Sequence, residues 1–207
     1  GIVITASHNP PEYNGYKVYD RKGCQLIPEL IDQVIAEINK IDDELSIEVN
    51  LSDNQRALIH WIDHEIDDIY IKRVLEIQNR PEMDKSNLNL VFTPQHGTAL
   101  IPVTDVFNKA GYPYILVDEQ CSFDPDFPNT KSPNPEEKVA YEKAIDLARK
   151  VNADGVLSTD PDADRVGIVV KHNNEYILLT GNQTGSILIE YLLKTKTQLN
   201  TLPKNPV

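Results

Sequence analysis

Segments of strand and helix character alternate along residues 88–179, and this alternation constrains the fold more than any other feature. The segments typical of strands are 88–93, 114–117 and 155–158, and the helical segments between them are 100–110 and 135–151. Strand–helix–strand order is typical of βαβ units, whose strands run parallel. We therefore expect an α/β fold with mixed, largely parallel sheets and helices on their faces.

Turn residues delimit these segments. Gly111 follows the first helical segment and is suited to end it, and residues 121–135, rich in Pro, Asp and Asn, predict a long loop. Asn173-Asn174 separates two apolar runs, 166–170 and 176–179, which indicates a β-hairpin. A further helical pattern begins at residue 182.

The first 80 residues are organised differently. Residues 1–5 and 16–19 are typical of two paired strands, with Asn14-Gly15 as a hairpin signal between them. Apolar residues at helical spacing predict two helices, the first starting near Pro28 and the second covering 62–74. Polar residues 42–56 favour a solvated loop, and 80–82 a linker.

Both ends of the chain look cut. The sequence starts at Gly1 inside an apolar strand, so we expect residues before it, since an unpaired strand is a poor start for a domain. At the other end, a helical pattern over 187–193 runs into 197–207 without a further core element. We expect residues to be missing there too.

Composition excludes several classes of protein. The chain has 207 residues, 40% of them hydrophobic, and a formal net charge of −12. This acidic balance argues against nucleic-acid binding, which needs clustered Lys and Arg, and no run of 18 apolar residues indicates a membrane span. Two cysteines, Cys24 and Cys121, do not form a disulfide framework, and free thiols in a cytoplasmic protein are the simpler interpretation.

The strongest chemical signal is the segment Asp160-Pro161-Asp162-Ala163-Asp164-Arg165. Three carboxylates at alternate positions follow a predicted parallel strand, at the sheet edge where α/β proteins bind ligands. They repel one another unless a cation lies among them, and all-oxygen ligands favour Mg²⁺ or Ca²⁺. An EF-hand is excluded, because its sixth and twelfth positions, Gly and Glu, are Arg165 and Lys171 here. A solvated acidic turn remains the structural alternative.

The second signal is Thr5-Ala6-Ser7-His8-Asn9-Pro10. A serine at the end of a strand, in a loop stiffened by proline, is a candidate nucleophile, and it needs a base or electrophilic help. His8 and Lys17 are the nearest candidates. The segment is not the G-x-S-x-G elbow of an α/β-hydrolase, and taken alone it also fits an ordinary turn.

Together the two signals resemble a known family. Thr5–Pro10, Tyr13–Lys17, Thr93-Pro94-Gln95-His96-Gly97 and Asp160–Arg165 occur in the order found in the α-D-phosphohexomutases, which include phosphoglucomutase and phosphomannomutase. The extended first motif is most similar to the phosphoglucomutase branch. The resemblance implies four domains, of which this chain holds the end of domain 1 (1–80), domain 2 (81–178) and the opening of domain 3 (179–207).

The resemblance also implies a role for individual residues. Ser7 matches the serine that carries the transferable phosphate. Asp160, Asp162 and Asp164 match the Mg²⁺ ligands, with the phosphate oxygen on Ser7 completing the metal site. Arg165 matches a phosphate-binding arginine beside that site. His8 and Lys17 match residues proposed for proton transfer or phosphate contact, and His96 is most simply a structural histidine.

The implied reaction interconverts glucose 1-phosphate and glucose 6-phosphate, with glucose 1,6-bisphosphate as intermediate and activator, in the cytoplasm. The implied partner is a small sugar phosphate, without nucleic acid or membrane. The isolated chain is expected to have little activity, because the later domains' sugar-selecting and phosphate-binding loops have no counterpart in it. A phosphomannomutase or phosphoglucosamine mutase, a metal-dependent phosphatase with an Asp nucleophile, and a noncatalytic metal-binding module remain alternatives.

Overall fold

A computed structural model describes residues 1–205, apart from the side chain of residue 63. The chain forms two compact units. Unit 1 comprises residues 1–5 and 14–66, and unit 2 comprises residues 6–13 and 67–207. The segment between the first two strands therefore belongs to unit 2, whereas the strands themselves belong to unit 1.

Unit 1 contains the expected strand pair. Strands β1 (Ile2–Ile4) and β2 (Tyr16–Val18) are antiparallel, with Ile4 opposite Tyr16. The strands are as predicted, but Asn14-Gly15 is not a two-residue turn. It closes the end of a much longer connection, in which the Thr5 amide donates to the Gly15 carbonyl at 3.1 Å. A long connection leaves the nucleophile candidate in a loop instead of in a strand.

Helix α1 (Pro28–Ile38) starts at the predicted proline, which fits the first helical turn because the missing N–H has no intrahelical partner there. Residues 42–56 are not simply a loop. They include a 3₁₀ turn, η1 (Glu44–Ser46), and a short helix, α2 (Asp53–Arg56). Ser52 and Gln55 cap α2 reciprocally, a capping-box signal that composition alone conceals.

Helix α3 (Asp63–Glu76) confirms the second helix, but its burial differs from the pattern. Ile66, Ile69 and Tyr70, three of the apolar residues whose helical spacing predicted this helix, are more than half exposed, whereas Ile71 is buried. The periodicity therefore located the helix without identifying the residue that packs.

Unit 2 is built on a five-stranded mixed sheet with the strand order β4-β3-β5-β6-β7. The strands are β3 (Leu90–Thr93), β4 (Tyr114–Leu116), β5 (Gly155–Thr159), β6 (Val166–His172) and β7 (Glu175–Leu178). Strand β3 pairs in parallel with β4 and β5, and β5–β6 and β6–β7 are antiparallel. Unit 2 thus has the expected α/β fold. Strands β4, β3 and β5 run parallel, whereas β6 and β7 join the sheet in antiparallel pairs.

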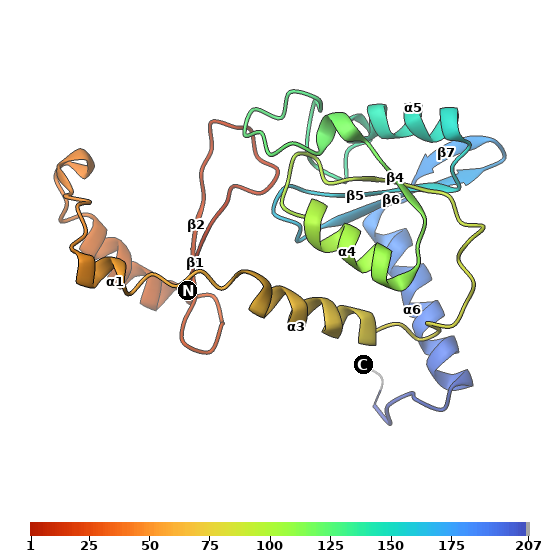
Figure 1. Ribbon diagram of the computed structural model, residues 1–207, viewed down its shortest axis with the longest axis horizontal. Helices are drawn as coiled ribbons and strands as arrows, with labels where there is room; N and C mark the ends of the chain where they lie inside the picture. Colours follow the sequence, from red (N-terminus) through yellow and green to blue (C-terminus); the bar gives the residue numbers. More distant parts are fainter. Residues whose placement is uncertain (206–207) are drawn as a thin grey trace. The chain divides into compact units, whose positions relative to one another are not determined.

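Helices cover both faces of this sheet. Helix α4 (Leu100–Ala110) and helix α5 (Glu142–Val151) lie on opposite sides in Figure 1. Successive residues of a strand point to opposite faces. The Phe92 ring accordingly meets Phe107 of α4 edge-on at 5.7 Å, and Val91 packs into the core cluster with α5. Both faces of β3 are thus buried, as in parallel sheets.

The connections follow the local sequence closely. Gly111 ends α4 with a φ of 74°, and Asn173 and Asn174 adopt φ values of 49° and 63° in the β6–β7 turn, as a type I′ turn requires. A loop follows η2 (Asp118–Gln120). Helix α5 begins later than predicted, because the end of this loop and the 3₁₀ turn η3 (Lys138–Tyr141) occupy the first residues of the predicted helix. Helix α6 (Gly181–Gln198) fulfils the last helical pattern. Among the described residues, no helix is long and apolar enough to cross a membrane.

Candidate metal and phosphate site

The aspartate loop leaves the carboxyl end of the central strand β5, as the βαβ pattern predicted. Carboxylate oxygens of Asp160, Asp162 and Asp164 lie within 4.8 Å of one another. The turn is closed by the Ala163 amide, which donates to the Asp160 carbonyl at 3.0 Å, and Ala163 itself is left-handed (φ 61°). The turn aims three acidic side chains at one point, which is the arrangement a hard cation requires.

Asp160 is the anchor of the loop, with a fully buried side chain. The backbone amide of Arg165 donates to its Oδ1 at 2.9 Å. Burial raises the pKa of this carboxyl above its ordinary value, and a hydrogen bond with Asp162 raises it further, whereas hydrogen bonds from Ser7 and Arg165 lower it. A buried carboxylate whose ionised form is disfavoured gains from a nearby cation.

Ser7 lies against this anchor, although 153 positions separate the two residues. Its hydroxyl donates to Asp160 Oδ2 at 2.5 Å. Both residues belong to unit 2, because the segment Ala6–Tyr13 is part of that unit. Ser7 has a φ of 54° in a turn closed by the Asn9 amide and the Ala6 carbonyl at 3.1 Å. The tertiary structure therefore brings the two strongest sequence signals into one site.

His8 completes a short hydrogen-bonded chain. Its Nδ1 lies 3.0 Å from Ser7 Oγ and 3.8 Å from Asp160 Oδ2. The Ser7 hydroxyl, which donates to Asp160, therefore lies between the His8 imidazole and the Asp160 carboxyl group. The chain runs from imidazole to hydroxyl to carboxylate, and the serine proton faces the aspartate.

The remaining candidates have different surroundings. Arg165 is exposed, and its Nη1 lies 3.5 Å from Glu136 Oε1. Lys17 lies on β2 opposite Val3 and belongs to unit 1, so its proposed role in the site stays a prediction. His96 is buried, and its Nδ1 donates to the Ser122 carbonyl at 2.8 Å, the hydrogen bond expected of a structural histidine.

Sequence reasoning missed a network of buried amides behind the site. Gln95 and Gln120 are fully buried. Gln95 Nε2 donates to the Ala140 carbonyl at 2.7 Å and lies 3.3 Å from Ser158 Oγ, two residues before Asp160. Thr93 Oγ1 donates to Gln120 Oε1 at 2.7 Å. The only available signal was the unusual presence of glutamines beside apolar strands.

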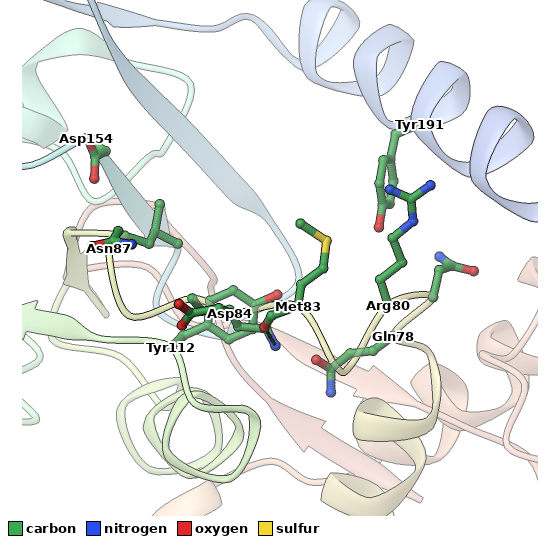
Figure 2. A pocket seen from close by; sticks show the side chains of 11 residues that line it. Gln78, Arg80, Met83, Asp84, Asn87, Tyr112, Asp154 and Tyr191 are labelled. Carbon is green, nitrogen blue, oxygen red and sulfur yellow. Dashed lines mark hydrogen bonds between the residues drawn. The ribbon is translucent and has the colours of Figure 1, made fainter.

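A hollow of about 510 Å³ elsewhere in unit 2 offers less chemistry. Figure 2 shows Arg80 and Tyr191 on one side of it and Asp84 with Tyr112 on the other. The Lys85 ammonium, which also lines it, donates to the Pro81 and Met83 carbonyls. Charges of both signs line the walls without converging, so Ser7 and the aspartates remain the candidate functional site.

Comparison with known proteins identifies the family. Residues 68–174 match the model of the phosphoglucomutase/phosphomannomutase α/β/α domain II, and residues 1–45 match that of domain I. The chain belongs to the phosphoglucomutase/phosphomannomutase family, the class of mutases that the sequence motifs resembled.

Individual relatives agree with this assignment. The chain is 37% identical over 201 residues to phosphoglucomutase from Staphylococcus aureus (strain MRSA252), covering 96% of the chain and 36% of that protein. Its identity to phosphoglucomutase from Staphylococcus epidermidis (strain ATCC 35984) is 39% over 198 residues, covering 94% and 36%. The chain thus spans about a third of the length of these relatives.

Solved structures show the same fold. A phosphoglucomutase/phosphomannomutase family protein from Burkholderia thailandensis superposes with a TM-score of 0.67 at 22% identity, covering 93% of this chain and 37% of that one. N-acetylphosphoglucosamine mutase from Aspergillus fumigatus superposes with a TM-score of 0.57 at 16% identity, covering 95% and 48%.

Proposed function

We propose that the whole protein carrying this sequence interconverts glucose 1-phosphate and glucose 6-phosphate through a phosphorylated Ser7. The observation that carries the proposal is the contact of Ser7 Oγ with Asp160 Oδ2 at 2.5 Å, beside two more aspartates. The similarity to curated phosphoglucomutases favours glucose phosphates over mannose or amino-sugar phosphates.

The donor set fits Mg²⁺. Asp160, Asp162 and Asp164 offer oxygen ligands alone, and the buried Asp160 gains from a neighbouring positive charge. When bound, the ion neutralises phosphate charge, which is most of what catalysis of phosphoryl transfer requires. The three aspartates, with a phosphate oxygen on Ser7, are the proposed ligands.

The reaction proceeds in two balanced halves. A sugar hydroxyl attacks the phosphorus of phosphoserine, the Oγ–P bond breaks, and the hydroxyl proton ends on Ser7 Oγ. The bisphosphorylated sugar then turns over, and Ser7 Oγ attacks its other phosphate, returning a proton to the sugar oxygen that is released. Glucose 1,6-bisphosphate is therefore both the intermediate and the compound that phosphorylates a bare Ser7.

The other candidate side chains divide the remaining tasks. His8 Nδ1, hydrogen-bonded to Ser7 Oγ, is placed to carry a proton to or from that oxygen. Arg165, and Lys17 from unit 1, are proposed to bind phosphate oxygens, because their cationic side chains complement phosphate. We further propose that the protein acts in the cytoplasm, and that domain boundaries fall at residues 80 and 178.

Phosphorylation tests the proposal directly. After exposure of the whole protein to glucose 1,6-bisphosphate, intact mass should show the gain of one phosphate. Ser7→Ala should abolish this gain, whereas Ser186→Ala, which alters an exposed helical serine, should not. Steady release of inorganic phosphate that is indifferent to Ser7→Ala would indicate a phosphatase instead. Failure of Ser7 to carry phosphate under any condition would leave a noncatalytic module.

The metal assignment has its own test. Asp162→Asn should lower mutase turnover by orders of magnitude, because it weakens one proposed ligand. Asp68→Asn, the same change of charge on the exposed surface of α3, should leave turnover unchanged. Near-normal turnover of Asp162→Asn in a coupled assay would contradict the assignment.

A further inference from the structure

A second loop, residues 94–98, lies directly against the aspartate loop. It leaves the carboxyl end of β3, the strand that pairs in parallel with β5. The Thr98 amide donates to the Pro161 carbonyl at 2.8 Å, and Thr98 Oγ1 donates to the same oxygen at 3.2 Å. The carbonyl that these two groups fix lies between Asp160 and Asp162 in the chain.

Gly97 makes the contact closer than any side chain allows. A Cβ atom at this position would lie 2.3 Å from Pro161 Cα and 2.4 Å from its carbonyl oxygen. Both are backbone atoms, which cannot rotate away as the end of a side chain can. Any residue other than glycine must therefore displace the backbone between two of the proposed metal ligands.

The loop holds a conformation that its own residues disfavour. Gln95 and His96 have φ values of 50° and 62° in a turn closed by the Gly97 amide and the Pro94 carbonyl at 2.8 Å. Left-handed backbone is disfavoured for a residue other than glycine, because its Cβ comes too close to the following carbonyl oxygen. Such strain persists only where the surroundings fix the conformation more strongly.

Buried hydrogen bonds supply that constraint from several directions. The His96 amide donates to the Gln120 carbonyl at 2.8 Å, and its Nδ1 to the Ser122 carbonyl. The Gln95 side chain donates to the Ala140 carbonyl and lies against Ser158 of β5. Strand β5, η2 with the two residues that follow its end, η3 and the 94–98 loop are thus joined by hydrogen bonds around the end of β5.

We propose that Gly97 and Thr98 are positioning residues that set the geometry, and therefore the metal affinity, of the aspartate loop. This inference rests on the proposed function, because it assumes that Asp160, Asp162 and Asp164 bind a divalent cation. The loop touches neither substrate nor metal in this role. It acts by fixing Pro161, so that three carboxylates converge without having to reorganise when the cation binds.

Direct metal binding tests the inference. We would measure the affinity of the whole protein for Mn²⁺, which takes the same oxygen ligands as Mg²⁺, by electron paramagnetic resonance. Gly97→Ala should weaken the affinity at least tenfold and raise the Mg²⁺ concentration needed for half-maximal turnover, with turnover partly recovered at high Mg²⁺. Thr98→Val, which removes only the side-chain donor, should weaken the affinity about two- to threefold. Gly185→Ala, whose Cβ would meet nothing within 4 Å, is the matched control and should change neither quantity.

Two further measurements keep the outcomes distinct. Hydrogen exchange on peptides from β6 and β7 should be unchanged in Gly97→Ala, which separates a displaced loop from a lost fold. If Gly97→Ala does not fold, an unchanged Mn²⁺ affinity of Thr98→Val overturns the inference. Asp162→Asn distinguishes the two proposals. If it weakens Mn²⁺ binding while folded Gly97→Ala does not, the inference alone fails, and if Asp162→Asn has no effect, the metal assignment itself fails.

Discussion

Units 1 and 2 have similar hydrophobic patterning and very different burial. Helix α1 in unit 1 and helix α5 in unit 2 are both amphipathic, yet α1 buries none of its residues, whereas α5 buries Ala144, Ile145 and Ala148. Unit 1 offers a two-stranded sheet and unit 2 a five-stranded one. Among residues 1–62, all of which are described, none is buried. The comparison teaches that periodicity predicts a helix, while burial requires a partner surface large enough to receive it.

The largest expected difference between the units is the loss of stability when a large apolar side chain is replaced by alanine. Phe92→Ala removes a buried ring that packs against Phe107, and it should lower the stability of unit 2 by about 3–5 kcal/mol. Leu45→Ala in unit 1 removes a side chain that is 95% exposed and should cost less than about 0.5 kcal/mol. Hydrogen exchange on peptides from β3, β5 and η1 measures both. Similar losses at the two positions would break the comparison.

A buried hydroxyl should show a smaller contrast. Tyr141 is fully buried, and its hydroxyl donates to the Pro135 carbonyl at 2.8 Å. Tyr141→Phe leaves that carbonyl without its donor and should destabilise unit 2 by about 1–3 kcal/mol. The counterpart in unit 1, Tyr16→Phe, alters a half-exposed ring and should be close to neutral. Urea denaturation of each variant gives the two values, and equal values would contradict the expectation.

One cysteine in each unit allows a chemical comparison. Cys24 in unit 1 is exposed, whereas Cys121 in unit 2 is half-buried, and both are free thiols. Burial, and secondarily the charge of Asp118, raises the pKa of the Cys121 thiol. Because the thiolate is the nucleophile, Cys24 should react with a disulfide reagent at least tenfold faster, about 1.4 kcal/mol in activation free energy.

The cysteine prediction is checked by following the reaction at pH 8 in time. Two phases are expected, and Cys24→Ser should remove only the fast one. A fast phase that survives this substitution would show that Cys121 is the more reactive thiol. That result would contradict the expected difference between the two units.

The smallest expected effect is a decline in the unfolding free energy of unit 2 at alkaline pH. The Tyr176 hydroxyl donates to the Ala148 and Ala153 carbonyls at 2.8 and 2.7 Å, and burial raises its pKa above the ordinary 10.0. A raised pKa in the folded state stabilises the fold below the unfolded-state pKa, and this contribution is lost as pH rises through the folded-state pKa. Unfolding free energies measured from pH 9 to 11 should therefore decline, and Tyr176→Phe should flatten the decline. Tyr70→Phe, at an exposed ring, is the control and should leave the slope unchanged.

Much of the fold follows from local chemistry. The helix 100–110 and the turn at Asn173-Asn174 occur where predicted, because Gly111 and the two asparagines tolerate left-handed backbone. The errors have local causes too. A reciprocal cap between Ser52 and Gln55 forms a helix inside a segment that looked like a loop. A 3₁₀ turn takes the place of the first turn predicted for α5.

The candidate site also has one part that the sequence predicts and one part that it does not. The aspartate loop could be located from the sequence, because three acidic residues at alternate positions after a buried strand favour a bound cation. The support of that loop could not. In the sequence, nothing distinguishes Gly97 from an ordinary turn glycine. Only the packing of β3 beside β5 places it against the backbone of Pro161.

The sequence by itself determined the order of strands and helices, the turns between them and the three aspartates of the proposed metal site, since each depends on residues a few positions apart. Only the tertiary structure decided which helical face is buried, that Ser7 meets Asp160 across 153 positions, and that Gly97 abuts Pro161. The physical reason is that backbone preferences and periodicity act over one or two turns of chain. Contacts between distant segments depend on how complete elements pack, and no local pattern encodes that packing.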